Sequence, residues 1–129
     1  MALRVVRLGS PRSRGEGLRI GAARRPPRGV KKADYAKRNF YDVWLPELAP
    51  SQQWVSWALS KPWTDPRWRK YARNYRREMR EPRAEHLIGL LTALSHSTNL
   101  SVGCYCEDER RCHRSLLRDL LREHGAKLA

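Results

Sequence analysis

The sequence predicts a small single-domain, layered α/β fold over residues 1–129, with helices flanking a mixed or mostly parallel sheet. Two observations support this prediction. Short segments rich in branched residues are separated by longer segments with helical spacing of apolar residues. A chain of 129 residues also has the length of one domain with its own core, and no stretch within it is long enough to act as a linker.

Three segments are predicted to be strands. Residues 3–8 alternate in side-chain character, residues 18–22 form a weaker strand, and residues 99–105 give the clearest strand pattern. Residues 40–45 have the aromatic and branched content of a buried segment, but their period is ambiguous. Residues 24–29 contain two adjacent prolines, which predict an extended, rigid and basic segment.

Four helices are predicted from apolar residues at helical spacing. The first runs from an N-cap at Ser51 to residue 59, and the second starts at Asp65-Pro66 and reaches about residue 80. Pro82 begins a third helix whose leucines, Leu90 among them, are expected to pack inward. The fourth runs from about residue 112 to 123 and precedes a glycine.

The charge balance predicts an anionic partner. The chain has 27 Lys and Arg against 13 Asp and Glu, which gives a formal net charge of +14. Such a field favours phosphorylated small molecules or non-specific binding of nucleic acid. Two basic segments, 24–38 and 67–80, carry much of this charge, but no helix-turn-helix, zinc-finger or RNP pattern supports sequence-specific recognition.

The cysteines indicate the compartment and the site. All three lie within nine positions, which is unlike the spread, even-numbered cysteines of secreted disulfide frameworks and favours a reduced cytoplasmic setting. No run of residues has the apolar length of a membrane span, so no membrane partner is expected.

The candidate site is the junction between the predicted strand 99–105 and the last helix. Cys104 and Cys106 would share one side of a strand, and Cys112 and His113 would stand at a helix start. A helix N-terminus and neighbouring cations lower the pKa of a thiol there. Cys104, Cys112 and His113 are therefore the candidate catalytic residues, as thiolate or as orienting base.

Four explanations of this junction remain open. The first is nucleophilic or redox thiol chemistry, and the second is an anion site in which His113, Arg114 and Ser115 grip a phosphate at the helix start. The third is a structural metal site of the cysteines and His113, whose spacing departs from that of ordinary zinc knuckles. The fourth is that the cysteines are simply small buried apolar residues.

Three ordered motifs resemble the DUF488 family of small prokaryotic α/β proteins of unassigned function. They are Leu18-Arg19-Ile20 with Pro27-Arg28-Gly29-Val30, the segment 43–51, and Cys104 followed by Cys112-His113-Arg114-Ser115. The resemblance runs nearly end to end. It implies one cysteine at a strand end, eight residues before Cys-His-Arg, so Cys106 is an additional thiol in this chain.

The chain also departs from the pattern of this family. Many relatives read Asp-Arg-Leu-Trp-Pro-Arg-Gly where this chain reads Ala-Arg-Arg-Pro-Pro-Arg-Gly at residues 23–29. An acid and an aromatic residue are therefore missing from this segment.

Together, the patterns favour a pocket for an anionic, phosphorylated or nucleotide-like ligand, with a reactive thiol. Cys104 or Cys112 would be the thiolate, and Arg28, Arg114 and Ser115 would contact the ligand. The alternatives are a non-enzymatic nucleic-acid-associated module and a Cys/His structural metal site. No cofactor is predicted, and the oligomeric state stays open.

Overall fold

Four short parallel strands form a single sheet in the computed structural model, which describes residues 1–129. The strands are β1 (Leu3–Arg7), β2 (Leu18–Gly21), β3 (Val43–Trp44) and β4 (Leu100–Cys104). Their order is β1-β4-β2-β3, and every neighbouring pair is parallel. Each strand lies within a segment singled out from the sequence, and the predicted small α/β fold is confirmed. β4 is central, and all five of its residues are buried.

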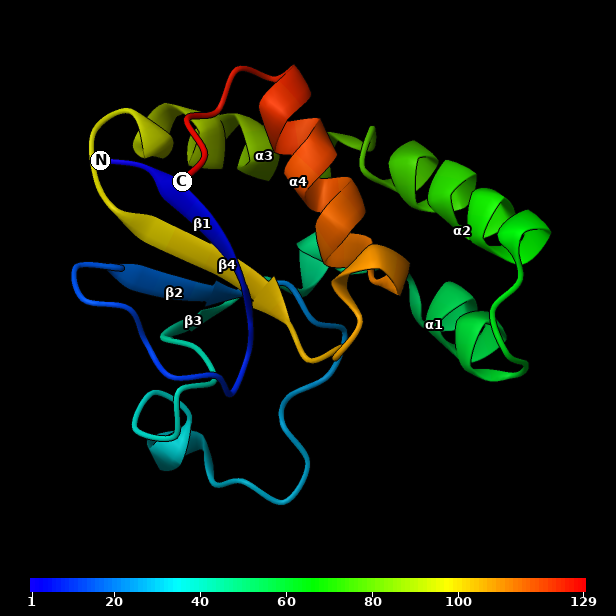
Figure 1. Cartoon of the computed structure of the whole chain (residues 1–129), viewed down its shortest axis with the longest axis horizontal. Coiled ribbons are helices and arrows are strands. Elements are labelled where there is room, and N and C mark those ends of the chain that lie inside the picture. Colours follow the sequence, from blue (N-terminus) through cyan, green and yellow to red (C-terminus); the bar gives the residue numbers. More distant parts are fainter.

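Four α-helices and three 3₁₀ turns complete the chain (Figure 1). They are η1 (Lys32–Asp34), η2 (Pro46–Leu48), α1 (Gln52–Leu59), α2 (Asp65–Glu78), α3 (Pro82–Ser95), η3 (Glu109–Arg111) and α4 (His113–Glu123). The four α-helices start within about two residues of the predicted positions, and α1, α2 and α4 also end within about two residues of theirs. None of them combines the length and the apolar character needed to cross a membrane.

Different groups cap the starts of α2, η3 and α4. Thr64 caps α2, and its hydroxyl accepts a hydrogen bond from the backbone N–H of Arg67 at 3.3 Å. The acidic run before α4 caps η3 instead, because the Asp108 carboxylate accepts from the N–H of Arg110 at 3.0 Å. Cys112 therefore occupies the N-cap position of α4. This leaves a thiol, rather than a carboxylate, at the helix start.

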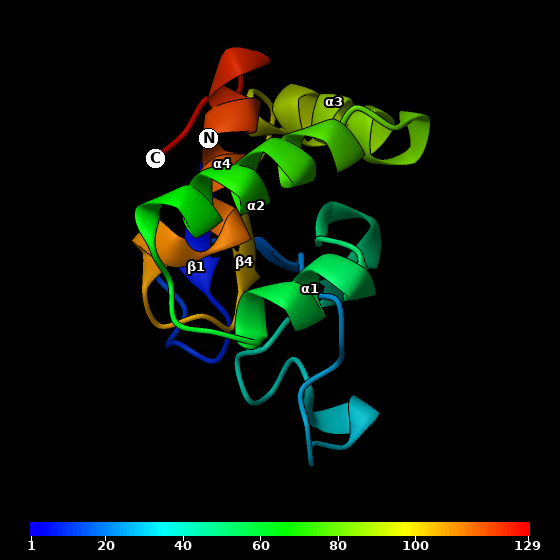
Figure 2. The ribbon, with the colours of Figure 1, turned by 90° about the vertical axis from the view of Figure 1, so that its right-hand side faces the viewer.

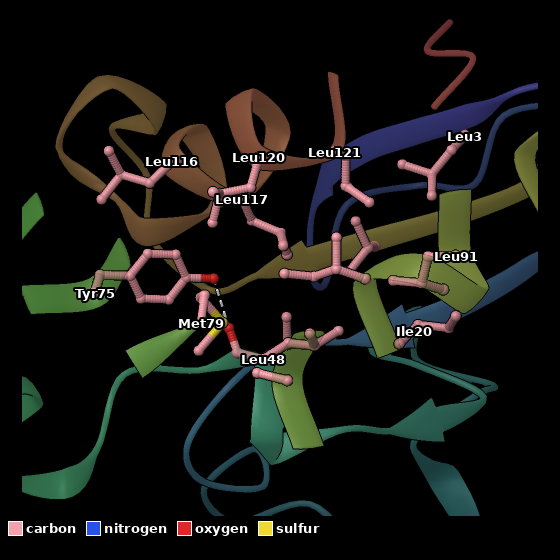
Figure 3. Close-up of a cluster of buried hydrophobic side chains, with 14 of the residues drawn as sticks. Leu3, Ile20, Leu48, Tyr75, Met79, Leu91, Leu116, Leu117, Leu120 and Leu121 are labelled. Carbon is pink, nitrogen blue, oxygen red and sulfur yellow. Dashed lines mark hydrogen bonds between the residues drawn. The ribbon is translucent and has the colours of Figure 1, made fainter. Parts of the chain in front are cut away.

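The main core lies between one face of the sheet and the helices (Figure 3). Leu100 and Val102 alternate onto this face and meet the buried leucine stripe of α4, which includes Leu117 and Leu121. The hydroxyl of Tyr75 donates to the carbonyl of Leu48 at 2.8 Å and so ties α2 to η2. The burial expected for Leu90 was wrong, because its side chain is 54% exposed.

The other face of the sheet is covered by loops around a buried ion pair. Arg19 is completely buried, and its Nε lies 2.8 Å from the Oε2 atom of Glu16. Ser101 of β4 donates to the same carboxylate at 2.6 Å. The remaining donors of Arg19 reach the carbonyls of Ser10 and Asn39. This network fixes the loops before β2 and before β3 against the sheet.

Gly21 lets an aromatic ring approach the same face closely. A Cβ atom at Gly21 would lie 2.4 Å from the ring of Tyr41. Tyr41 is buried in a small second cluster with Leu8 and Ala23. The polypeptide between β2 and β3 is thereby held below the sheet, opposite α3 and α4 (Figure 1).

Candidate functional site

A cavity of about 300 Å³ opens at the carboxyl ends of β2 and β4. Ligand sites of open parallel sheets form at this edge, because the loops that follow the strands meet there. The cavity is lined by the ends of β2 and β4 with the loops that follow them, by α1 and the segments on either side of it, by α2 and by the start of α4. The fifteen lining residues are Ala23, Arg24, Arg25, Pro50, Val55, Ala58, Leu59, Trp63, Tyr71, Cys104, Tyr105, Cys106, Arg111, Cys112 and His113. Figure 2 faces the side of the molecule on which α1 and α2 lie.

The three thiols meet in this cavity. Cys104 ends β4, Cys106 lies two residues further in the loop, and Cys112 caps α4. Their Sγ atoms all lie within 4.8 Å of one another, and those of Cys104 and Cys106 are 3.8 Å apart. Cys104 and Cys112 are buried, Cys106 is exposed, and all three are free thiols. The five residues between Cys106 and Cys112, which include η3, thus return the chain so that Cys112 lies beside the two thiols at the end of β4.

The cluster favours one thiolate, at Cys104. Hydrogen bonds from the thiols of Cys106 and Cys112 lower the pKa of Cys104 far below that of an ordinary thiol, although burial opposes the shift. The same hydrogen bonds raise the pKa of Cys106 and of Cys112, which are the donors. The N-terminal end of α4 adds a positive dipole beside the sulfur atoms.

His113 is held as a neutral imidazole. Burial lowers its pKa, and its Nε2 atom lies 2.5 Å from the carbonyl oxygen of Ala22, at the end of β2. A carbonyl can only accept, so Nε2 carries the proton and Nδ1 carries the lone pair. Nδ1 lies 3.9 Å from the Sγ atom of Cys112. The ring therefore lies against the Cys112 thiol and offers its single proton a second acceptor beside the Cys104 sulfur.

Three arginines line the cavity, and no aspartate or glutamate does. Arg24 donates to the carbonyls of Pro50 and Ala49, at 2.8 and 3.1 Å, which fixes its guanidinium at the wall. Arg25 makes a single side-chain hydrogen bond, from Nε to Gln52, and keeps its terminal donors free. Arg111 is paired with Asp65 at 2.8 Å, outside the lining. The local field in the cavity favours an anion.

The structure brings together the candidate catalytic residues Cys104, Cys112 and His113, and places the candidate ligand contacts elsewhere. Arg114 is buried behind the cavity, where its Nη1 donates to the carbonyls of Cys104 at 3.2 Å and Val6 at 3.4 Å. It thus joins α4 to the ends of β1 and β4.

The other two candidate ligand contacts also lie outside the cavity lining. Ser115 donates to the carbonyl of Cys112 at 2.8 Å within the first turn of α4. Arg28 is exposed and lines a neighbouring shallow cavity.

The sequence reasoning did not assign Arg24, Arg25 or Arg111 to the site. Arg24 and Arg25 follow β2 by three and four residues. The rule that loops at the carboxyl edge of a parallel sheet carry sites would have selected them, had the parallel order of β2 and β4 been known.

The three cysteines could also hold one thiophilic metal ion. Four thiolates around zinc, at about 2.3 Å each, lie about 3.8 Å apart at the corners of a tetrahedron. The Cys104–Cys106 separation of 3.8 Å matches that edge, and all three sulfur atoms are close enough to share an ion after small rotations. The fourth coordination position would be left to a group entering from the cavity.

One family model matches nearly the whole chain. The sequence model of the DUF488-N3a family, described as the active DUF488-N3 subclade, matches residues 3–125. The chain belongs to the DUF488 family. No curated protein and no solved structure matches it.

Proposed function

We propose that the cavity binds an anionic ligand with a flat apolar body, and that Cys104 acts on it as a nucleophile. The observation that carries the proposal is the convergence of three thiols on a cavity that is lined by three arginines and no carboxylate. A thiolate beside an anion-binding site is the arrangement that nucleophilic catalysis on a charged substrate requires.

The walls of the cavity suit one ring system. Val55, Trp63 and Tyr71 provide apolar and aromatic surface, and the volume of about 300 Å³ lies at the small end of ligand pockets. Arg25 has free donors for a phosphate or carboxylate at the mouth. A phosphorylated or nucleotide-like molecule combines these two features, so this is the class of ligand that we assign.

The reaction class is displacement at an electrophilic atom of the bound ligand. The Cys104 thiolate forms a bond to that atom, and the leaving group departs with the electron pair of the broken bond. No proton has to leave Cys104, since it starts as a thiolate, and Cys106 and Cys112 stabilise this form by hydrogen bonding. His113 positions Cys112. The description of the matching subclade as active supports a chemical role.

Alkylation with iodoacetamide, followed by peptide mapping, tests the nucleophile. The reaction is run on reduced, metal-free protein at about pH 6, where an ordinary thiol is almost entirely protonated and reacts slowly. Because Cys104 is a thiolate at this pH, it should react faster than free cysteine and faster than Cys112. A Cys104→Ser variant should lose the fast phase. Inorganic phosphate and a 5′-mononucleotide should slow the reaction by occupying the cavity. The proposal fails if none of the three cysteines reacts faster than a free thiol.

A metal-binding role is the second candidate, and the sulfur spacing favours it. Equilibrium dialysis against zinc should then give one ion per chain, and a Cys106→Ser variant should bind it more weakly. A reduced, folded protein that takes up no zinc at micromolar concentration rejects this role. The alkylation test is independent of that result, because it uses metal-free protein.

A further inference from the structure

A second, shallow cavity of about 390 Å³ adjoins the first. Its lining consists of Arg25, Pro26, Pro27, Arg28, Phe40 and Tyr105, and two of these residues, Arg25 and Tyr105, also line the first cavity. Tyr105 is fixed by a hydrogen bond from its hydroxyl to the carbonyl of Arg25 at 3.0 Å and by edge-to-face packing on Phe40. The two cavities therefore share a wall that carries a guanidinium and an aromatic ring.

The 24–38 segment continues from this shared wall as a row of unpaired cations. It contains seven Lys and Arg residues and a single acid, Asp34. None of the seven takes part in an ion pair, although eight arginines elsewhere do. Five of the seven, Arg28, Lys31, Lys32, Lys37 and Arg38, are exposed and lie beyond the lining of the first cavity. A small anion in the first cavity would make no use of them.

We propose that the ligand of the site is a single-stranded nucleic acid. One nucleotide enters the first cavity, its neighbour lies in the second cavity, and the backbone continues along the 24–38 segment. This inference rests on the proposed function, since it names the class of ligand that the first cavity takes. Single strands are bound in this way elsewhere, with a basic groove along the phosphates and aromatic side chains against the bases.

A single strand fits this surface better than a duplex does. The first cavity holds about one ring system, so a base must leave any stack to enter it. The second cavity offers the rings of Phe40 and Tyr105 as apolar surface for an adjacent base. Arg25 stands at the junction, where the phosphate between the two nucleotides would lie.

The basic outer face of α2 is a different surface. Arg69, Arg73 and Arg77 are exposed and make no ion pair, so they carry the same charge as three cations of the 24–38 segment, although Arg77 also donates a hydrogen bond to the side chain of Asn74. They line neither of the two cavities. In the view of Figure 2, α1 lies between α2 and the 24–38 segment. The α2 face therefore provides a matched control for the effect of charge alone.

The test compares two triple variants of the full chain. The segment variant carries Arg28→Gln, Lys31→Gln and Lys32→Gln, and the control variant carries Arg69→Gln, Arg73→Gln and Arg77→Gln. The probes are a fluorescein-labelled oligothymidylate of about eight nucleotides, in the range of single-strand site sizes, and thymidine 5′-monophosphate. Affinity is measured by fluorescence anisotropy and by calorimetry over a salt series, after circular dichroism has shown that both variants are folded.

The expected result is a selective loss in the segment variant. Its affinity for the oligothymidylate should fall about tenfold or more, and the slope of log K against log salt should become shallower by about 2, since each phosphate contact on a single strand contributes about 0.7. Its affinity for the mononucleotide should stay within about twofold of wild type. The control variant should keep most of the oligothymidylate affinity and the slope.

Two results would overturn the inference. An equal loss of oligothymidylate affinity in both variants would mean that net charge attracts the strand and that the 24–38 segment has no particular role. An oligothymidylate bound no more tightly than the mononucleotide would limit the ligand to the first cavity. In either case, a mononucleotide that still binds and still protects Cys104 from alkylation leaves the proposed function intact. Failure of the mononucleotide to bind or protect would instead reject the proposed function itself.

Discussion

Replacing Glu16 by Gln should destabilise the protein strongly at neutral pH, because it leaves Arg19 as an uncompensated buried charge. Arg19 is fully buried, and Glu16 is 2% exposed. Breaking a buried pair by removing one partner costs about 3–5 kcal/mol. The Gln side chain keeps one acceptor for Arg19 or Ser101, so we expect a loss of about 3 kcal/mol in the free energy of unfolding.

The Glu16 carboxylate should also make the free energy of unfolding fall as the solution becomes acidic. Burial raises the pKa of Glu16, but hydrogen bonds from Arg19, Ser101 and the N–H of Ser13 outweigh it and lower the pKa from 4.5 to about 2. A lowered folded-state pKa means that the stabilisation is complete above the unfolded-state pKa of about 4.5 and is lost as the pH falls toward 2. At 1.36 kcal/mol per pKa unit, the loss amounts to about 3 kcal/mol.

Urea unfolding followed by tryptophan fluorescence, at pH values from about 7 down to about 2.5, measures both effects. The wild type should lose stability between about pH 4.5 and 2.5, and Glu16→Gln should show a flatter profile from a lower starting value. Glu85→Gln, at an exposed position of α3 without an ion pair, is the control and should stay within about 0.5 kcal/mol of wild type. Parallel pH profiles of wild type and Glu16→Gln would refute the role assigned to this carboxylate.

Two further predictions concern the thiols and the sheet. Cys106→Ala removes the largest contribution to the lowered pKa of Cys104, so the alkylation rate of Cys104 at about pH 6 should fall roughly tenfold or more; an unchanged rate would show that Cys106 does not stabilise the thiolate. Gly21→Ala drives a methyl group into the ring of Tyr41 and should cost about 1–3 kcal/mol in chemical denaturation. Gly89→Ala, where nothing lies within 4 Å, should instead stabilise α3 by about 0.5–1 kcal/mol, and a loss there would contradict the propensity argument.

The elements of the fold could be predicted because their signals are local. The alternation in residues 99–105 and the leucine spacing of the last helix depend on neighbours within a few positions, and the structure has both elements where they were expected. The thiol cluster could be predicted from the sequence for the same reason. Its three cysteines lie within nine residues, so a strand followed by a helix was enough to bring them together.

The roles of individual arginines could not be predicted, because they depend on distant partners. Arg19 stands in a strand whose pattern gave no sign that its side chain is completely buried, and its counter-charge Glu16 was noticed only as an isolated acid. Arg114 follows the candidate histidine directly, yet its side chain turns away to the carbonyls of two strands. The capping of α4 also depends on its neighbour, because Asp108 caps η3 and leaves Cys112 at the N-cap position of α4.

These assignments change how the net charge of +14 should be interpreted. Eight arginines are paired with carboxylates. Arg114 is buried and donates hydrogen bonds to backbone carbonyls, so it is not available to a ligand. The unpaired cations include two separate groups, the 24–38 segment and the outer face of α2, and only the first of these adjoins the thiols. Total charge predicts attraction to any polyanion. The position of the free cations favours one path across the surface, and that path ends at Cys104.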